Sequence, residues 1–174
     1  MDMVLIAAGA ALLAVCSWIS IPMTVPFTMQ TFAVFFLLLL LGGRRGTAAV
    51  LVFLLLGAAG APVFAEFSGG IGILLGQTGG YMIGFLLTGV SYLLMTRFFG
   101  EKRPVQITSL LIGLVLCYTF GTLWFAHVYA ADNGPVGLWS VLGWCVFPYV
   151  LPDLLKMALA FVLEKRVSAA LKSR

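Results

Sequence analysis

Charge is scarce in this sequence: Lys, Arg, Asp and Glu together make up 9% of its 174 residues, whereas a typical soluble domain has about 25%. The sequence contains no GxxxxGK[ST] phosphate loop, Ser/His/Asp set, HExxH motif or paired Cys/His cluster, which argues against nucleotide hydrolysis and against an enzyme. Apolar residues take their place, with 62% hydrophobic residues and a mean hydropathy of +1.13. This composition predicts a membrane protein, with one integral domain over residues 1–174.

Histidine and cysteine are also rare. His127 lies in the aromatic run TLWFAHVY, where a packed, hydrogen-bonded side chain is a better interpretation than a proton shuttle. Cys16, Cys117 and Cys145 are odd in number, widely spaced and flanked by apolar residues. This pattern favours buried thiols over a disulfide framework or a metal cluster, so we expect no metal and no cofactor.

Apolar segments separated by Pro, Gly and charged residues predict six transmembrane helices, at about 4–21, 27–43, 47–61, 79–97, 105–130 and 149–168. The second and third are short for a bilayer, so we expect tilt or local thinning to help them. The first segment lacks a basic n-region and a cleavage site, and we therefore interpret it as a retained helix.

Nine of the ten basic residues fall on one side of this topology: Arg44, Arg45, Arg97, Lys102, Arg103, Lys165, Arg166, Lys172 and Arg174. The positive-inside bias then places both termini in the cytoplasm, with the chain as a multi-pass protein of a cell membrane. The three connections on the outer side hold Glu66 and Asp132 and no base. Topology therefore explains the net charge of +4, and the lipid bilayer rather than nucleic acid is the expected partner.

The tenth base, Lys156, follows Asp153 by three residues in the outer half of the sixth predicted helix, so the two side chains share one helical face. Each costs about 2.5–3.5 kcal/mol to insert near mid-membrane, and such residues normally face a cavity and pair with each other or with a ligand. Two interpretations are open. The pair anchors a ligand with both donors and acceptors in an outward-facing pocket, or it is an ion pair that locks this helix against a neighbour.

Further polar groups lie on the same outer side. Gln30, Gln77, Thr78 and Tyr81 supply neutral hydrogen-bonding groups, and apolar walls with a few placed polar groups are typical of small-molecule sites. Trp139 and Trp144 fit either a ligand contact or an aromatic belt at the membrane interface. The glycine-rich stretch 62–81 has no lysine for a phosphate, so we interpret it as a lid in which glycine permits sharp turns.

The first predicted helix is rich in small residues. Ala7 with Ala11, and Ala10 with Ala14, form pairs at four-residue spacing, which lets another helix approach closely. That helix belongs either to this chain or to another subunit. A pocket without an energy source, together with such a face, suits a binding subunit of a larger transporter.

Three strings, IPMTVPFTMQT (21–31), GAAGAPVFAEFSGGIGILLGQTGGYMIGF (57–85) and PDLLK (152–156), resemble the BioY family in their order and spacing, and the resemblance extends over essentially the whole chain. These are the biotin-binding S components of energy-coupling-factor (ECF) transporters. The resemblance implies the ECF S-component fold: all-α, with six transmembrane helices, cytoplasmic termini and a biotin pocket near the outer surface. It also implies that the connections between helices 1 and 2 and between helices 3 and 4 close this pocket.

In this family the residues that match Asp153 and Lys156 bind biotin, and the alanine-rich first helix docks on the transmembrane coupling subunit (EcfT type), which maps to Ala7, Ala11 and also Ala10 and Ala14. ABC-type ATPase subunits then supply the energy for uptake. Phe27, Phe64, Trp139 and Tyr81 are candidates to cover the bicyclic ring of biotin. Gln77 departs from the family pattern GPTGGY and is either an added ligand contact or a change in loop stiffness.

Four alternatives are open besides this function. In two of them the chain is still a transport protein: an S component for another small vitamin, or a subunit that moves biotin alone. An intramembrane enzyme that uses Asp153, and a structural membrane subunit with a locked Asp153/Lys156 pair, belong to other functional classes.

Overall fold

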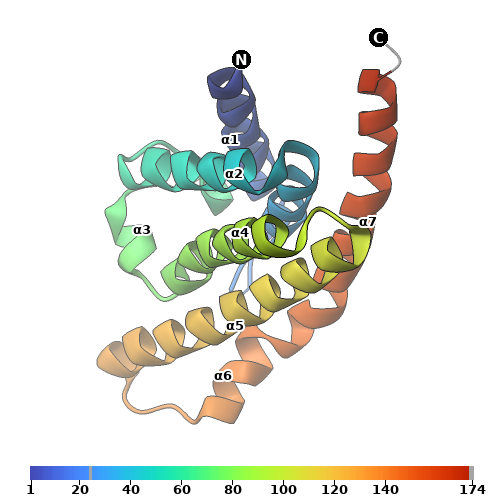
Figure 1. Cartoon of the computed structure of the whole chain (residues 1–174). Coiled ribbons are helices and arrows are strands. Elements are labelled where there is room, and N and C mark those ends of the chain that lie inside the picture. Colours follow the sequence, from blue (N-terminus) through green and yellow to red (C-terminus); the bar gives the residue numbers. More distant parts are fainter. Residues whose placement is uncertain (24, 173–174) are drawn as a thin grey trace.

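Helices make up nearly all of this computed structural model, which describes residues 1–23 and 25–172 (Figure 1). The helices are α1 (Asp2–Trp18), α2 (Gln30–Ala58), α3 (Ile71–Leu75), α4 (Gly79–Phe99), α5 (Arg103–Asn133), α6 (Leu138–Cys145) and α7 (Phe147–Lys172). Between them lie strands β1 (Ser20–Ile21) and β2 (Phe27–Thr28) and the short 3-10 turn η1 (Ala65–Phe67). The all-α prediction is confirmed, apart from the two-residue antiparallel strands that pair Ser20 with Thr28.

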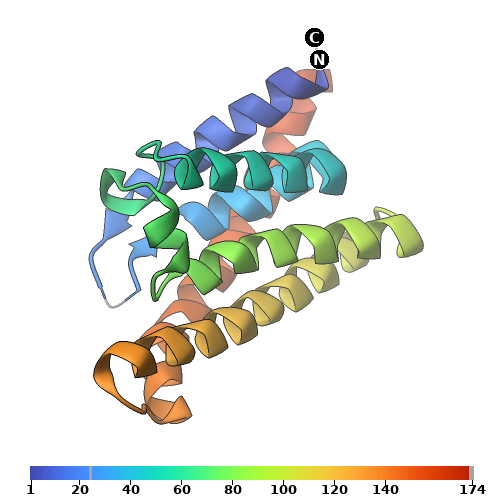
Figure 2. The ribbon, with the colours of Figure 1, turned by 90° about the vertical axis from the view of Figure 1, so that its left-hand side faces the viewer.

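Helix α2 is a folded-back pair rather than one straight rod. Gly42 has a φ of 79°, a left-handed conformation that suits glycine, and it divides the helix into segments 30–41 and 43–58. The two halves lie side by side (Figure 2), and a Cβ atom added to Gly46 would lie only 3.0 Å from the carbonyl oxygen of Leu37. The sequence predicted two helices here with a boundary near Arg44 and Arg45. The reversal instead occurs at Gly42, and both arginines lie inside the second half.

Within the described part of the chain, four helical stretches are long and apolar enough to cross a membrane: Gln30–Ala58, Gly79–Phe99, Arg103–Asn133 and Leu138–Ala170. Helix α1 is also apolar but has 17 residues, and α2 counts as a single stretch although it folds back at Gly42. The structure therefore shows a helical membrane protein. The count of six spans stays a prediction.

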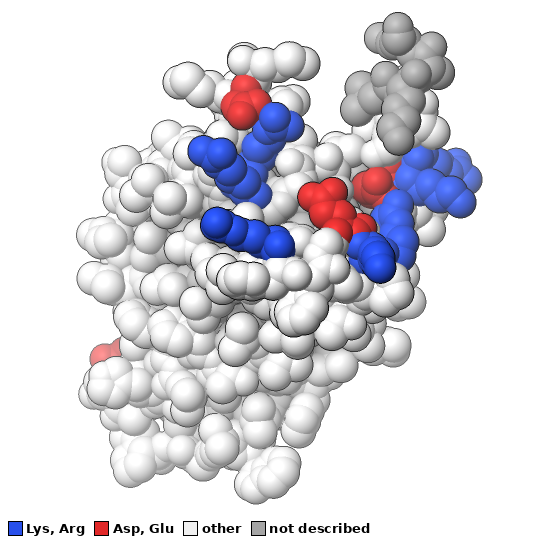
Figure 3. Space-filling model, viewed as in Figure 1, with Lys and Arg blue, Asp and Glu red and all other residues white. Residues whose placement is uncertain are grey.

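Charged side chains gather at the end of the molecule where the two termini lie (Figures 1 and 3). Two ion pairs lie there, Arg45 with Asp2 at 2.8 Å and Arg103 with Glu164 at 2.8 Å. Most of the remaining surface in Figure 3 carries neither sign of charge. For the bases whose side chains the structure describes, this arrangement agrees with the predicted topology, in which all but Lys156 share one side.

Candidate ligand-binding site

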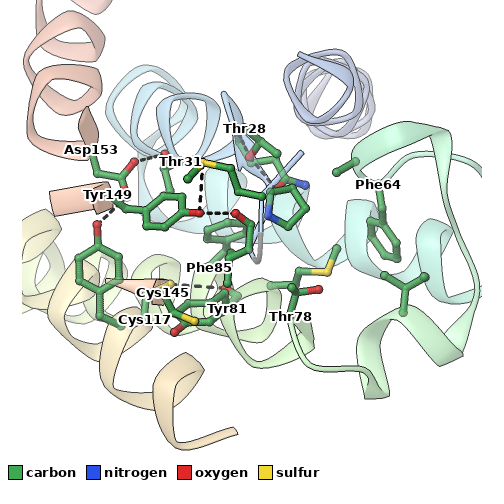
Figure 4. A pocket seen from close by; sticks show the side chains of 18 of the residues that line it. Thr28, Thr31, Phe64, Thr78, Tyr81, Phe85, Cys117, Cys145, Tyr149 and Asp153 are labelled. Atoms are coloured by element: carbon green, nitrogen blue, oxygen red, sulfur yellow. Dashed lines mark hydrogen bonds between the residues drawn. The ribbon is translucent and has the colours of Figure 1, made fainter. Parts of the chain in front are cut away.

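A cavity of about 410 Å³ opens among seven parts of the chain: the β1–β2 connection, the first turn of α2, the 59–78 connection, helices α4, α5 and α7, and the end of α6 (Figure 4). Its walls are mostly apolar and sulfur-containing. The polar residues that line it are Thr28, Gln30, Thr31, Glu66, Ser68, Thr78, Tyr81, Tyr118, Tyr149, Asp153 and Lys156. A volume of this size is within the range of small-molecule sites, roughly 300–1,000 Å³.

Asp153 and Lys156 project into this cavity from one face of α7, as the i, i+3 spacing predicts. Both residues are buried, with exposed fractions of 3% and 6%, and Lys156 Nζ lies 2.9 Å from Asp153 Oδ1. An ion pair removed from water to this degree needs additional hydrogen bonds to offset the loss of hydration. The surrounding helices provide them.

The Asp153 carboxylate accepts hydrogen bonds from two other helices. Thr31 on α2 donates its hydroxyl to Oδ1 at 2.7 Å, and Tyr118 on α5 donates to Oδ2 at 2.7 Å. Three helices that are far apart in sequence therefore meet at one carboxylate. Thr31 and Lys156 both donate to Oδ1 and Tyr118 donates to Oδ2, so the carboxylate is fixed in position and Oδ2 can accept one further hydrogen bond.

The Lys156 ammonium is also surrounded. It donates to the carbonyl oxygen of Thr28 at 2.7 Å and to the hydroxyl of Thr31 at 3.1 Å, and it lies 4.1 Å from the centre of the Phe27 ring. The ring face is a favourable place for a cation. Phe27, predicted to cover a ligand ring, thus packs on the ammonium in this structure. A ligand that binds Lys156 has to share or replace these contacts.

The neutral polar candidates divide into two groups. Gln30, Thr78 and Tyr81 line the cavity. Gln30 is buried and ties α1 to β2, since its amide donates to the Ser17 hydroxyl at 2.5 Å and accepts from the Thr28 hydroxyl at 3.0 Å. Gln77 is only partly buried and, like Trp139, lies outside the lining of this cavity.

Trp139 is 79% exposed on α6, which agrees with an aromatic residue at the membrane interface. Neither Trp139 nor Gln77 gains support from this geometry as a ligand contact. Phe64, in contrast, is 1% exposed, lines the cavity and packs edge-on against Phe53 with ring centres 5.4 Å apart. It fits only because position 57 is glycine: an added Cβ there would lie 1.9 Å from the Phe64 ring.

Several polar residues of the site escaped the sequence analysis, among them Thr31, Tyr118 and Tyr149. Tyr149 on α7 donates its hydroxyl to the carbonyl oxygen of Val25 and stacks on Phe27 with ring centres 6.2 Å apart, so it holds the β1–β2 connection against α7. A hydroxyl next to Gln30, and a tyrosine in the apolar run LVLCYTF, were the available signals. Both are weak, because isolated hydroxyls are common in membrane helices.

The four alanines predicted to dock a partner lie on two different faces of α1. Ala10 and Ala14 are buried in the core, with exposed fractions of 3% and 6%, whereas Ala7 and Ala11 are exposed. The internal helix that uses the small-residue spacing is α2, which α1 approaches closely where Gly9 meets Ala49. Ala10 and Ala14 are therefore covered by the chain itself, whereas Ala7 and Ala11 lie on the surface. Docking on this helix stays a prediction.

The three cysteines are free and buried, as predicted. Cys117 and Cys145 line the cavity, and Cys16 lies in the core beside α2. Among the described residues, no group of three or more His, Cys, Asp or Glu side chains is placed to hold a metal ion. The cavity is thus equipped for hydrogen bonding and apolar contact with an organic ligand.

The profile of the BioY family matches residues 1–173. The chain belongs to the BioY family. Among similar curated proteins, the biotin transporter BioY of Thermotoga maritima is 38% identical over 166 residues, covering 94% of this chain and 94% of the relative. The probable biotin transporter BioY of Pyrococcus horikoshii is 36% identical over 165 residues, covering 94% of this chain and 93% of the relative.

The fold of this BioY-family chain is also similar to a solved structure. A crystal structure of the S-component for biotin from an ECF-type ABC transporter matches it with a TM-score of 0.79 and 26% identity, over 97% of this chain and 90% of that one. The fold is therefore that of an ECF S component. Membership in this family identifies a transport protein rather than an enzyme, so the intramembrane-enzyme alternative is excluded.

Proposed function

We propose that this chain is the biotin-binding S component of an ECF-type uptake transporter, and that the cavity around Asp153 and Lys156 holds biotin. The observation that supports this most strongly is a buried acid–base pair on α7 that faces a cavity of about 410 Å³, in a fold similar to the S-component for biotin. Buried ionisable groups inside a membrane domain are rare unless a ligand or a pathway requires them.

The chemistry of biotin matches the polar groups of the site. Biotin has a ureido ring with two N–H donors and a carbonyl, a thioether ring, and an aliphatic tail that ends in a carboxylate. Asp153 accepts a ureido N–H, and Lys156 donates either to the ureido oxygen or to the tail carboxylate. Charge-assisted bonds of this kind are about twice as strong as neutral ones. Apolar lining residues such as Phe64 and Phe85 then cover the rings.

The topology in the membrane follows from the charges. We infer six spans, formed by α1, the two halves of α2, α4, α5 and α7, with both termini in the cytoplasm of a prokaryotic cell. The positive-inside bias and the gathering of basic residues near the termini support this orientation (Figure 3). The cavity then faces outward, and the β1–β2 connection and the 59–78 connection, which both contribute lining residues, act as its lids.

Transport in this proposal needs partners. The chain captures biotin outside and docks through the exposed Ala7 and Ala11 on a transmembrane coupling subunit (EcfT type), whose ABC-type ATPases supply the energy. Replacing both alanines with leucine should leave biotin binding unchanged and abolish uptake by the complete transporter. Uptake measured with and without the ATPases separates this function from a subunit that moves biotin alone.

Mass spectrometry of small molecules that co-purify with the detergent-solubilised protein tests the substrate without assuming it. Biotin at a stoichiometric level, lost in the Asp153→Asn variant, is the expected result. If another vitamin co-purifies instead, that vitamin rather than biotin is the substrate. Absence of any bound small molecule, together with no binding of added biotin, would favour the structural subunit with a locked ion pair.

A further inference from the structure

The exposed face of α1 leads directly to one of the two lids. Val4, Ala7, Ala8, Ala11, Val15 and Trp18 are all exposed, and their spacing of three and four residues places them on one side of the helix. At the last position, the Trp18 indole N–H donates to the carbonyl oxygen of Pro62 at 2.9 Å, and its ring stacks on Phe67 with centres 4.9 Å apart. A partner on this face therefore reaches the ring that holds the lid.

Two hydrogen bonds within residues 64–68 hold together the lid segment that Trp18 contacts. The Phe64 N–H donates to the Ser68 carbonyl at 3.0 Å, and the Ser68 hydroxyl donates to the Ala65 carbonyl at 2.7 Å. Glu66 and Phe67, inside this turn, have φ values of 58° and 56°, which side chains other than glycine rarely adopt. Such a conformation persists only when the surrounding contacts impose it, and the stacking of Trp18 on Phe67 is one of these contacts.

The two sides of this turn face different parts of the molecule. Phe67 points outward and stacks on Trp18, whereas Phe64, Ala65 and Glu66 line the cavity. Phe67 therefore directly adjoins residues of the cavity wall, since its chain neighbours Glu66 and Ser68 both line the cavity. The other lid is held differently, by Tyr149 on α7, so the helix that carries the acid–base pair contacts one lid and α1 contacts the other.

From these contacts we propose that Trp18 is a positioning residue that connects the exposed face of α1 to the lid at residues 64–68 and so sets how long the ligand stays bound. A coupling subunit seated on Ala7 and Ala11 contacts Trp18, loosens its hold on Pro62 and Phe67, and speeds release of the ligand. This inference rests on the proposed function, because it takes biotin as the ligand and the coupling subunit as the occupant of the α1 face.

Dissociation of radiolabelled biotin from the purified protein in nanodiscs tests whether Trp18 sets how long the ligand stays bound. Trp18→Phe keeps a stacking ring but removes the N–H donor, and we expect dissociation to be roughly two- to tenfold faster, the range for one lost hydrogen bond. Phe67→Ala should also speed dissociation, and the Trp18→Ala/Phe67→Ala double variant should release biotin no faster than Trp18→Ala alone, because Trp18→Ala already removes the stacking on Phe67. Trp144→Phe is the matched control: Trp144 is 42% exposed and contacts Tyr129 rather than the lid.

The complete transporter tests whether the coupling subunit acts on the lid through Trp18. Assembly with the coupling subunit and ATPases should speed biotin release from the unmodified chain and give no further acceleration in Trp18→Ala, although both chains assemble equally well. Unchanged dissociation in the Trp18 and Phe67 variants, or a fully additive effect of assembly, would overturn the inference and leave the proposed function intact. Failure of the unmodified chain to bind biotin would overturn both.

Discussion

Helix α7 carries two acidic residues that each pair with a base, and the two pairs differ in every respect that matters for function. Glu164 pairs with Arg103 of α5 at the charged end, where the side chains are 11% and 50% exposed. Asp153 pairs with Lys156 in the cavity, where the side chains are 4% and 7% exposed. The first pair has water and other charges nearby, whereas the second depends on hydrogen bonds from the protein.

The partners of the two pairs show the same contrast. Arg103 also donates to Gln106 at 3.2 Å and lies 5.7 Å from the centre of the Phe161 ring, which ties α5 to α7. None of these residues lines the cavity around Asp153. Asp153 and Lys156 share Thr31 and recruit Tyr118, and all four line the cavity. Charge alone thus does not mark a binding site. Burial, extra hydrogen bonds and an adjoining cavity together do.

Removing one member of the cavity pair should have the largest effect. Asp153→Asn or Lys156→Met leaves a buried charge without its partner, and such changes cost about 3–5 kcal/mol of stability. The double variant should be more stable than either single variant, because no unpaired charge remains. Thermal unfolding of the detergent-solubilised protein measures this order, and equal stability of all three variants would contradict the ion pair seen here.

The hydroxyls that orient Asp153 should matter less. Thr31→Val and Tyr118→Phe each remove one hydrogen bond to the carboxylate but keep its charge. We expect biotin affinity to fall about tenfold in each, the equivalent of about 1.4 kcal/mol. Thr108→Val is a matched control, since that hydroxyl is exposed and bonds only to its own helix at Pro104. An unchanged affinity in both variants would mean that these hydroxyls play no part in binding.

The natural cysteines distinguish the cavity from the core. Cys117 and Cys145 line the cavity and Cys16 does not. A small maleimide, followed by intact-mass measurement, should therefore label the cavity thiols slowly, and biotin should slow that labelling further. The Cys117→Ser/Cys145→Ser variant should show no labelling that biotin affects. Protection confined to Cys16 would place the ligand elsewhere.

Breaking the other pair should have the smallest effect. Arg103→Gln or Glu164→Gln removes an ion pair with a half-exposed member, which contributes about 0–1 kcal/mol to stability. Biotin affinity should remain within about twofold of the unmodified chain, because neither Arg103 nor Glu164 lines the cavity. A large loss of binding in either variant would show that the two pairs are coupled along α7.

Much of this site follows from the sequence, because Asp153 and Lys156 are conspicuous in an apolar helix and their spacing fixes a common face. Thr31 and Tyr118 do not stand out, because their role depends on how α2 and α5 are rotated toward α7. Gln77 lies in a glycine-rich connection whose path is set by close backbone approaches rather than by any periodicity.

Helix α1 shows a similar limit. Its apolar residues are distributed around the whole helix, so the sequence reveals small-residue spacing but not which pair faces inward. Packing decides it: Gly9, Ala10 and Ala14 lie against the body of the protein, and Ala7 and Ala11 face away. The sequence predicted two helices where α2 folds back. It did not predict that the reversal lies at Gly42, because either of the adjacent residues Gly42 and Gly43 can adopt the left-handed conformation.

Isothermal titration of biotin into the purified protein, run in parallel with Asp153→Asn and Glu164→Gln, tests the central claim most directly. The account predicts saturable binding by the unmodified chain and by Glu164→Gln. For Asp153→Asn it predicts binding weakened by a factor on the order of one hundred or more, because a charged hydrogen-bond partner is lost and Lys156 is left unpaired. Near-normal affinity in a folded Asp153→Asn variant would contradict the claim that this carboxylate binds the ligand.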